Sequence, residues 1–310
     1  MERLAVIDLG TNTFHLLITE TGGRIIPGNI CKETIAVKLG QGGINQGMIK
    51  PDAFERGLAA MKRFHKLIGL HQVSEVKAMA TAAIRNASNG SAFITEVKKL
   101  TGIDIEIIDG EKEASLIYMG VREAARMGEE PSLIMDIGGG SVEFILCNAW
   151  ELFWKKSFPI GAAKMMDQFH HSDPISPQDT LSITGHLEET LIELENECRK
   201  HKPKTLIGSA GAFETFAELV KQKFNLEGKE SSLPSTDINL EHFHQVASIL
   251  LQSTHEERSK MPGLITLRVD MIVVATIITQ FVLRLPDLNT LILSEYSLKE
   301  GILYDIISDD

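Results

Sequence analysis

The chain has 310 residues, of which 43% are hydrophobic and 24% charged, so it is long enough for two domains that each bury a core. Its formal net charge of −11 argues against general nucleic-acid binding, which requires a basic surface. The same charge means that a polyanionic substrate must be held by a local basic patch. The three cysteines, Cys31, Cys147 and Cys198, lack metal-ligand spacing, so we expect a reduced intracellular protein without a disulfide framework.

No targeting or membrane segment is expected. The chain begins within a strand, MERLAVIDLG, and lacks the charged lead and long apolar stretch of a signal peptide. The most apolar stretch, Met271 to Leu283, has 13 residues, which is too short to cross a bilayer as a helix. These observations predict a cytoplasmic protein that does not bind membranes.

The chain opens with a strand, an Asp-x-Gly turn that contains Asp8, and a second strand, in LAVIDLGTNTFHLLIT from Leu4 to Thr19. The elements expected next are a strand in 24–39, a loop at 40–47, a helix at 51–67, a strand at 75–80, the helical or turn-like TAAIRNASNG, a helix at 92–100, a strand at 104–108 and a helix at 110–125. Strands first and then alternating helices and strands indicate an α/β domain.

The stretch SLIMDIGGGSVEFIL, residues 132–146, repeats the first hairpin. An apolar strand ends at Asp136, the glycines at 138–140 and Ser141 form a turn, and a second strand follows. Glycines let backbone N–H groups surround an anion, because no Cβ blocks the approach or the positive φ angles. A carboxylate tolerates a neighbouring phosphate when a divalent cation lies between them, and Mg²⁺ prefers one or two carboxylates with phosphate oxygens and water. The stretch therefore predicts a site for Mg²⁺ and phosphate.

Two such copies predict two duplicated domains with a cleft between them. A strand follows the turn in both, whereas a helix follows the glycines in dinucleotide folds and P-loops. The polar segment MGEEPS at 127–132 is the best boundary, so the predicted domains are 1–126, on which a C-terminal helix at 297–310 packs back, and 127–296. Further elements expected in the second half are a strand at 152–158, a helix at 161–170, a long helix entered at Ser176-Pro177, a strand at 205–208, a turn and helix in SAGAFETFAEL, a mobile surface loop at 226–238, helices near 240–252 and 267–285, a strand at 288–293 and a final helix from Leu298.

This arrangement resembles the actin and sugar-kinase ATPase fold. Eight segments also resemble, in the same order, the exopolyphosphatase and guanosine pentaphosphate phosphohydrolase family: DLGTNTFHLLI, ATAAIRNASN, IIDGEKEA, DIGGGSVEF, GSAG, HEERSKMPGL, R-x-D at 268–270 and S-x-x-S-L-K-E-G at 294–301. The resemblance covers residues 6 to about 305, nearly the whole chain. It implies an α/β fold of two duplicated actin-like, ribonuclease H-like domains with a cleft between them.

The resemblance implies two catalytic residues. Arg85 in ATAAIRNASN matches the family's phosphate-binding arginine, although an arginine at a helix start is more often a solvated surface residue. Glu113 in DGEKEA matches the general base that orients or deprotonates the attacking water, and Glu111 competes for this role. Lys112 and Ser115 replace an acidic residue and an arginine that are usual in the family.

The remaining site residues are also implied by the resemblance. Asp136 and Glu143 match acidic positions linked to Mg²⁺, and Asp8 is a third possible ligand, through water. His15 is expected to be a hydrogen-bonded strand residue. Ala212 stands where the family usually has a threonine, so a hydroxyl contact to phosphate or ribose would be missing. This slightly disfavours specificity for a nucleotide. The predicted phosphate-binding residues are Thr11, Asn12, Thr13, Gly138, Gly139, Gly140, Ser141, Ser209 and Gly211.

The leading hypothesis is therefore a Mg²⁺-dependent exopolyphosphatase that removes the terminal phosphate of inorganic polyphosphate. Three alternatives stay open: a guanosine pentaphosphate phosphohydrolase that gives the tetraphosphate, a kinase of the wider fold, and a non-catalytic sensor of guanosine tetraphosphate.

Larger family members carry a further C-terminal domain that holds long polyphosphate. Because this chain ends at Asp310, we expect a preference for short chains, or processivity only as a homodimer. The candidates for a basic rim are Lys38, Lys155, Lys156, Lys164, Lys260 and Arg268.

Overall fold

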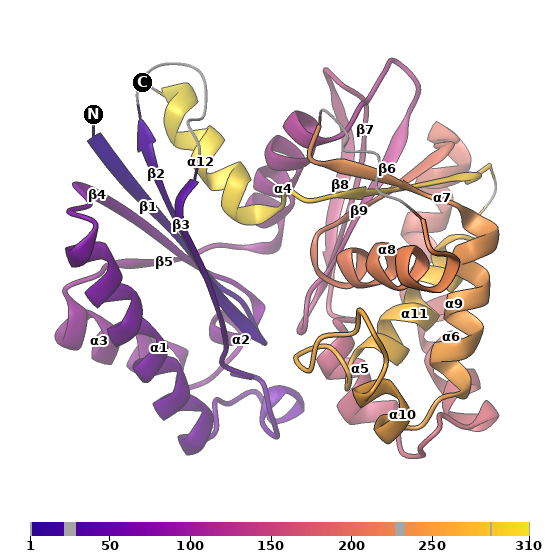
Figure 1. The fold of residues 1–310 in the computed structure, drawn as a ribbon, viewed down its shortest axis with the longest axis horizontal. Helices are drawn as coiled ribbons and strands as arrows, with labels where there is room; N and C mark the ends of the chain where they lie inside the picture. Colours follow the sequence, from indigo (N-terminus) through magenta and orange to yellow (C-terminus); the bar gives the residue numbers. More distant parts are fainter. Residues whose placement is uncertain (1, 22–28, 227–232, 286, 310) are drawn as a thin grey trace.

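A computed structural model describes residues 2–21, 29–226, 233–285 and 287–309. It contains two β-sheets side by side, each covered by helices on its outer face, with two helices between them (Figure 1). Within the described residues, no helix is both long and apolar enough to cross a bilayer.

The first sheet has five strands in the order β3-β2-β1-β4-β5. Antiparallel pairing joins β1 to β2 and β2 to β3, and parallel pairing joins β1 to β4 and β4 to β5. The bounds are β1 (Glu2–Leu9), β2 (Thr13–Thr21), β3 (Asn29–Ala36), β4 (Glu75–Ala80) and β5 (Ile105–Ile107).

The second sheet repeats this plan. Its order is β10-β11-β9-β6-β7-β8, with β7 antiparallel to its neighbours β6 and β8, and with β6, β9 and β11 parallel. The bounds are β6 (Ser132–Ile137), β7 (Val142–Cys147), β8 (Leu152–Phe158), β9 (Thr205–Ser209), β10 (Ser235–Ile238) and β11 (Thr290–Ser294). Apart from the extra edge strand β10, strand order and direction match the first sheet, which confirms the predicted duplication.

Helices cover both sheets. Those of the first half are η1 (Ile44–Gln46), α1 (Pro51–Leu70), α2 (Ala82–Arg85), α3 (Gly90–Thr101) and α4 (Gly110–Ala124). Those of the second half are α5 (Ala162–Phe169), α6 (Pro177–Thr190), α7 (Ile192–His201), α8 (Gly211–Phe224), α9 (Leu240–Gln252), α10 (His255–Ser259), α11 (Ile272–Val282) and α12 (Leu298–Asp309). Each sheet buries its outer face in a core of its own.

A third core lies between the sheets and joins the two halves. In Figure 1, α4 and the yellow α12 stand side by side in this space. Leu116 on α4 and Ile302 on α12 are fully buried there with side chains from β1 and β6. The helices approach so closely that a Cβ on Gly301 would lie 1.7 Å from the Leu116 carbonyl oxygen. Since α4 and α12 belong to a core that both sheets share, the domain boundaries at 126/127 and 296/297 stay predictions.

Four elements differ from the sequence prediction. The long helix after Ser176-Pro177 is two helices, α6 and α7, separated at Leu191. The helix expected at 267–285 is shorter, because hydrogen-bonded turns occupy 265–271 before α11 begins. The short helix α10 was not expected. Within the predicted loop at 226–238, residues 235–238 form strand β10, whose polar sequence fits an edge strand, and 227–232 lie outside the described residues.

Candidate functional site

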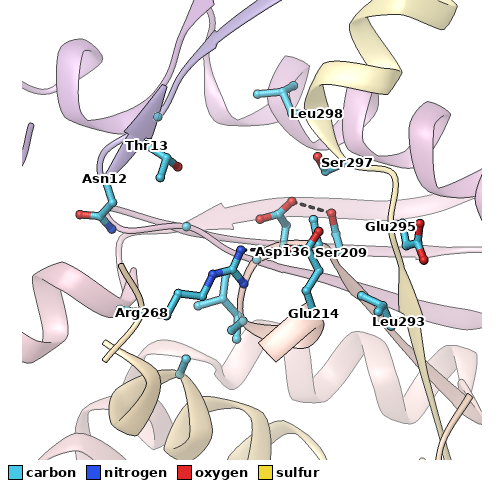
Figure 2. Close-up of a pocket in the computed structure, with 18 of the residues that line it drawn as sticks. Asn12, Thr13, Asp136, Ser209, Glu214, Arg268, Leu293, Glu295, Ser297 and Leu298 are labelled. Atoms are coloured by element: carbon cyan, nitrogen blue, oxygen red, sulfur yellow. Dashed lines mark hydrogen bonds and ion pairs between the residues drawn. The ribbon is translucent and has the colours of Figure 1, made fainter. Parts of the chain in front are cut away.

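A cleft of about 1610 Å³ lies between the two halves, where the β1–β2 and β6–β7 turns face each other. Figure 2 shows Asn12 and Thr13 on one side of it and Asp136 and Ser209 on the other. Among the described residues, eight carboxylates and four basic side chains line the cleft. The acids are Asp8, Glu113, Asp136, Glu143, Glu214, Glu218, Asp237 and Glu295, and the bases are Lys32, Lys221, Arg268 and Lys299.

Asp8 and Asp136 occupy matching places near the ends of β1 and β6. One carboxylate oxygen of Asp8, Oδ1, is buried without a hydrogen-bond partner among the described residues. Burial raises the pKa of Asp8 to about 7, partly offset by the Lys299 charge. The Ser209 hydroxyl donates to Asp136 at 2.7 Å, and burial raises the pKa of Asp136 to about 6. The two carboxylates therefore lack the counter-charge that burial of an anion requires.

Glu143 lies directly opposite Asp136 in the register of β6 and β7 and is 1% exposed. The Ser157 hydroxyl donates to its Oε1 at 2.6 Å. Burial, followed by the charges of Glu113 and Asp136, raises the pKa of Glu143 well above its ordinary value. The protein thus concentrates negative charge where the sequence predicted metal ligands.

The predicted ligands do not form a complete metal cage. Within the described part of the chain, no three His, Cys, Asp or Glu side chains are placed to hold one ion together. This donor set fits Mg²⁺, which takes one or two carboxylates and fills its remaining positions with phosphate oxygens and water. The unpartnered Oδ1 of Asp8 is the oxygen with the clearest need for such a cation.

The glycine turn at 138–141 lines the cleft. In the described residues, the amides of Gly139, Gly140 and Ser141 donate to no protein acceptor, while the carbonyls of Gly138 and Gly139 accept from the first residues of α5. None of the three glycines has a positive φ, so that part of the expectation is wrong. Glycine is needed here because the two turns approach each other closely. A Cβ on Gly139 would lie 2.2 Å from Asn12 Nδ2.

The first turn, Thr11 to Thr13, is held differently. Gly10 donates to the Thr13 carbonyl at 3.1 Å, and the Asn12 carbonyl accepts from the residues that follow β3. Asn12 Nδ2 reaches across the cleft to Met271 Sδ at 2.9 Å. Thr13 bonds His15 Nε2 at 2.9 Å, and burial lowers the pKa of His15 to about 3, so His15 is the neutral, hydrogen-bonded strand residue that we expected.

Glu113 lies on the cleft wall in the first turn of α4 and is 6% exposed. Arg85 Nη1 donates to Glu113 Oε2 at 3.0 Å and to the Ile108 carbonyl at 2.7 Å. Burial raises the pKa of Glu113 to about 7, while Arg85 opposes the rise. Glu111 is exposed on the same helix and does not line the cleft, so the geometry favours Glu113 over its competitor.

Arg85 is not among the residues that line the cleft and reaches the site through Glu113. The two departures from the family pattern on α4 also point elsewhere. Lys112 pairs with Asp305 on α12 at 2.9 Å, and Ser115 bonds Lys155. Neither replacement places a charge in the cleft.

The β9–α8 turn brings Ser209, Gly211 and Ala212 to the cleft. Gly211 has a φ of 52°, a backbone conformation that glycine adopts at little cost. The Ser209 hydroxyl donates its proton to Asp136, so in this structure Ser209 stabilises a carboxylate.

Lys299 and Glu214 are site residues that the sequence reasoning missed. Lys299 Nζ lies 3.0 Å from Ser297 Oγ and 3.1 Å from Glu300 Oε2, and its charge lowers the pKa of Asp8. The sequence feature that could have indicated Lys299 is the S-L-K-E-G motif, which belongs to one of the eight segments of the family resemblance. Of the six rim candidates, Arg268 lines the cleft, and the five lysines Lys38, Lys155, Lys156, Lys164 and Lys260 do not.

The Ppx/GppA phosphatase family matches residues 18–309. The chain belongs to this family. An exopolyphosphatase from Cytophaga hutchinsonii of known crystal structure is 41% identical, with a TM-score of 0.96 over 99% of this chain and 98% of that one. Exopolyphosphatase 2 of Mycobacterium tuberculosis is 26% identical over 97% of this chain and 98% of that protein. A Ppx/GppA family member from Aquifex aeolicus is 25% identical, with a TM-score of 0.79 over 99% of this chain and 98% of that one.

These similarities confirm three predictions. The family is the one that the eight sequence segments indicated. The fold is α/β, with two duplicated halves and a cleft between them. The protein is a phosphatase, an enzyme that hydrolyses phosphate bonds.

Proposed function

We propose that this phosphatase is a Mg²⁺-dependent exopolyphosphatase that removes the terminal phosphate of inorganic polyphosphate by attack of water in the cleft. The relatives from Cytophaga hutchinsonii and Mycobacterium tuberculosis are named exopolyphosphatases. The observation that carries the proposal is the buried carboxylate of Glu113, held by Arg85, on the wall of a cleft where three backbone amides lack an acceptor among the described residues.

Each side chain has a role that its surroundings support. The free N–H groups of Gly139, Gly140 and Ser141 hold phosphate oxygens, as unpaired backbone amides do at anion sites. Glu113, with a pKa near neutrality, takes a proton from the water as its oxygen attacks the terminal phosphorus. The bond from that phosphorus to the bridging oxygen then breaks, and the shortened chain leaves as an anion.

Arg85 acts through Glu113. One guanidinium nitrogen fixes the carboxylate and the Ile108 carbonyl, which orients the base. Its positive charge also opposes the pKa rise that burial imposes on Glu113, so a useful fraction of the base is ionised at neutral pH. The predicted contact between Arg85 and the terminal phosphate stays part of the proposal.

Mg²⁺ belongs to the proposal because the carboxylates of Asp8, Asp136 and Glu143 fit it. Asp8 has an oxygen without a partner in the described part of the chain, and all three side chains have raised pKa values in a cleft with excess negative charge. When bound, the ion would neutralise phosphate charge and polarise the bond that breaks.

Guanosine pentaphosphate is a second candidate substrate, and the apolar part of the cleft favours it. Beyond the turns, the wall includes Ala217, Ile265, Ile272 and Leu293, which a bare phosphate chain does not need. An apolar wall of this kind could accept the nucleoside of a nucleotide. The phosphate-holding turns and Glu113 would serve either substrate.

Phosphate release from polyphosphate, guanosine pentaphosphate and ATP, measured side by side with and without Mg²⁺, tests the proposal. We expect Mg²⁺-dependent release with the highest kcat/KM on polyphosphate. A higher kcat/KM on guanosine pentaphosphate would replace the first candidate by the second. Tight binding of guanosine tetraphosphate without any release would contradict both and indicate a sensor.

A further inference from the structure

Arg268 is the cleft residue best suited to grip a phosphate, and it is already engaged. Its Nη2 donates to Glu214 Oε2 at 2.8 Å, and its Nη1 donates to Thr215 Oγ1 at 3.3 Å. Arg268 comes from the turns before α11 and Glu214 from the first turn of α8. Figure 2 shows the two side chains pointing toward each other close to Asp136.

The pair lies within electrostatic reach of the predicted phosphate site. The charge of Arg268 lowers the pKa of Asp136 and the charge of Glu214 raises it. Arg268 is more enclosed, with 18% of its side chain exposed against 45% for Glu214. The arginine is thus fixed in the wall, while the carboxylate has room to turn away into solvent.

Two of the three lysines that line the cleft in the described residues lie near another carboxylate. Lys299 lies 3.1 Å and Lys32 lies 3.9 Å from the buried carboxylate of Glu300. An ammonium group is a point charge, whereas a guanidinium can donate two parallel hydrogen bonds to a phosphate. Among the described residues that line the cleft, Arg268 is the one arginine.

We propose that Glu214 limits the affinity for substrate, because it competes with the phosphates of the substrate for Arg268. The inference rests on the proposed function, because it assumes a polyphosphate chain in this cleft. In the free enzyme the carboxylate of Glu214 occupies the guanidinium. A bound phosphate chain takes its place, so each substrate that uses Arg268 must break the ion pair and accept a nearby negative charge.

Removing the charge of Glu214 should therefore tighten binding. For Glu214→Gln we expect the KM for polyphosphate to fall roughly fivefold, the upper range for a half-exposed ion pair. Arg268→Gln should raise KM, and in that background Glu214→Gln should gain clearly less than in the wild-type protein. Glu218→Gln is the matched control, because Glu218 lies one turn further along α8, lines the same cleft and bonds Gln222 instead of an arginine.

Binding of polyphosphate to the same variants in a Glu113→Gln background separates this inference from the proposed function. If the wild-type enzyme releases no phosphate, the proposed function fails, yet binding still reports on Glu214. A weaker affinity after Glu214→Gln would show that Glu214 merely positions Arg268 and would overturn the inference. An equal gain from Glu218→Gln would also overturn it, since the effect would then be general charge repulsion.

Discussion

The β1–β2 turn and the β6–β7 turn lie at equivalent places in the duplicated halves, but they use their polar groups in different ways. The first turn is closed by its own backbone bond from Gly10 to Thr13, and its carboxylate, Asp8, has an unpartnered oxygen. In the second turn the carboxylate, Asp136, is bonded by Ser209, and within the described residues the amides of both turns lack a protein acceptor, those of Thr11 and Asn12 in the first and of Gly139 to Ser141 in the second. The comparison indicates that both copies offer backbone donors for an anion, but that the carboxylate of the first copy has the stronger demand for a cation.

Gly139→Ala should disturb the contact between the two turns most strongly. The added Cβ would meet Asn12 Nδ2 at 2.2 Å and Thr11 Cβ at 2.9 Å, which forces the two turns apart and misplaces the amides. We expect kcat/KM for phosphate release to fall about 100-fold, as a misplacement of 1 Å can do. Gly185→Ala in α6 is the matched control, because a Cβ there meets no atom within 4 Å. An active Gly139→Ala variant would show that the turns do not act together.

The buried carboxylates of the cleft, whose pKa values are raised, predict that stability falls as pH rises. Asp8, Asp136 and Glu113 have folded-state pKa values of about 7, 6 and 7, raised from 3.8, 3.8 and 4.5. The folded protein therefore binds more protons than the unfolded chain between pH 4 and 7, and its stability falls as pH rises through this window. Without Mg²⁺, Tm should drop by about 5 °C or more from pH 5 to pH 8. Mg²⁺ should restore it at pH 8 and have little effect at pH 5, and a Tm that rises with pH would contradict the account.

Asp8→Asn and Asp136→Asn compare the two carboxylates directly. Removing the charge of Asp8 relieves an unpartnered buried oxygen, whereas Asp136 already accepts from Ser209. At pH 8 without Mg²⁺ we expect Asp8→Asn to stabilise the protein by about 1–3 kcal/mol and Asp136→Asn to do less. Denaturant unfolding measures both values. A larger gain from Asp136→Asn would reverse the assignment of the cation-seeking turn.

Ser209→Ala gives the smallest expected effect. It removes the one hydroxyl that bonds Asp136, so unfolding free energy at pH 8 should fall by about 1 kcal/mol. Ser182→Ala on α6 is the control, because that exposed hydroxyl bonds only a helix carbonyl. If both substitutions have the same effect, the bond to Asp136 contributes nothing special.

The sequence predicted what depends on local pattern. Two Asp-x-Gly hairpins indicated the duplication, and the eight family segments indicated the enzyme class. The choice of Glu113 over Glu111 needed the structure, since it depends on which face of α4 is buried against the cleft. Whether the site residues have their predicted roles stays open to the experiments above.

What the sequence missed depends on contacts between distant segments. Glu214 and Arg268 are 54 residues apart and meet because α8 and the turns before α11 face the same cleft. The five lysines proposed for the rim have the right charge but are not among the residues that line the cleft, and a sequence carries no signal for that. Strand β10 escaped prediction because an exposed edge strand lacks an apolar alternation.

Activity of Glu113→Gln beside Glu111→Gln tests the central claim most directly. Both glutamates lie in the first turn of α4, but only Glu113 is buried on the cleft wall. With Mg²⁺ and polyphosphate, we predict that Glu113→Gln folds, by circular dichroism, and loses about 10³-fold or more in kcat, while Glu111→Gln stays within twofold of wild type. Wild-type kcat/KM should rise with pH, reach half of its maximum near pH 7, where Glu113 is half ionised, and level off above that pH. A Glu113→Gln variant that hydrolyses polyphosphate at the wild-type rate would contradict the account.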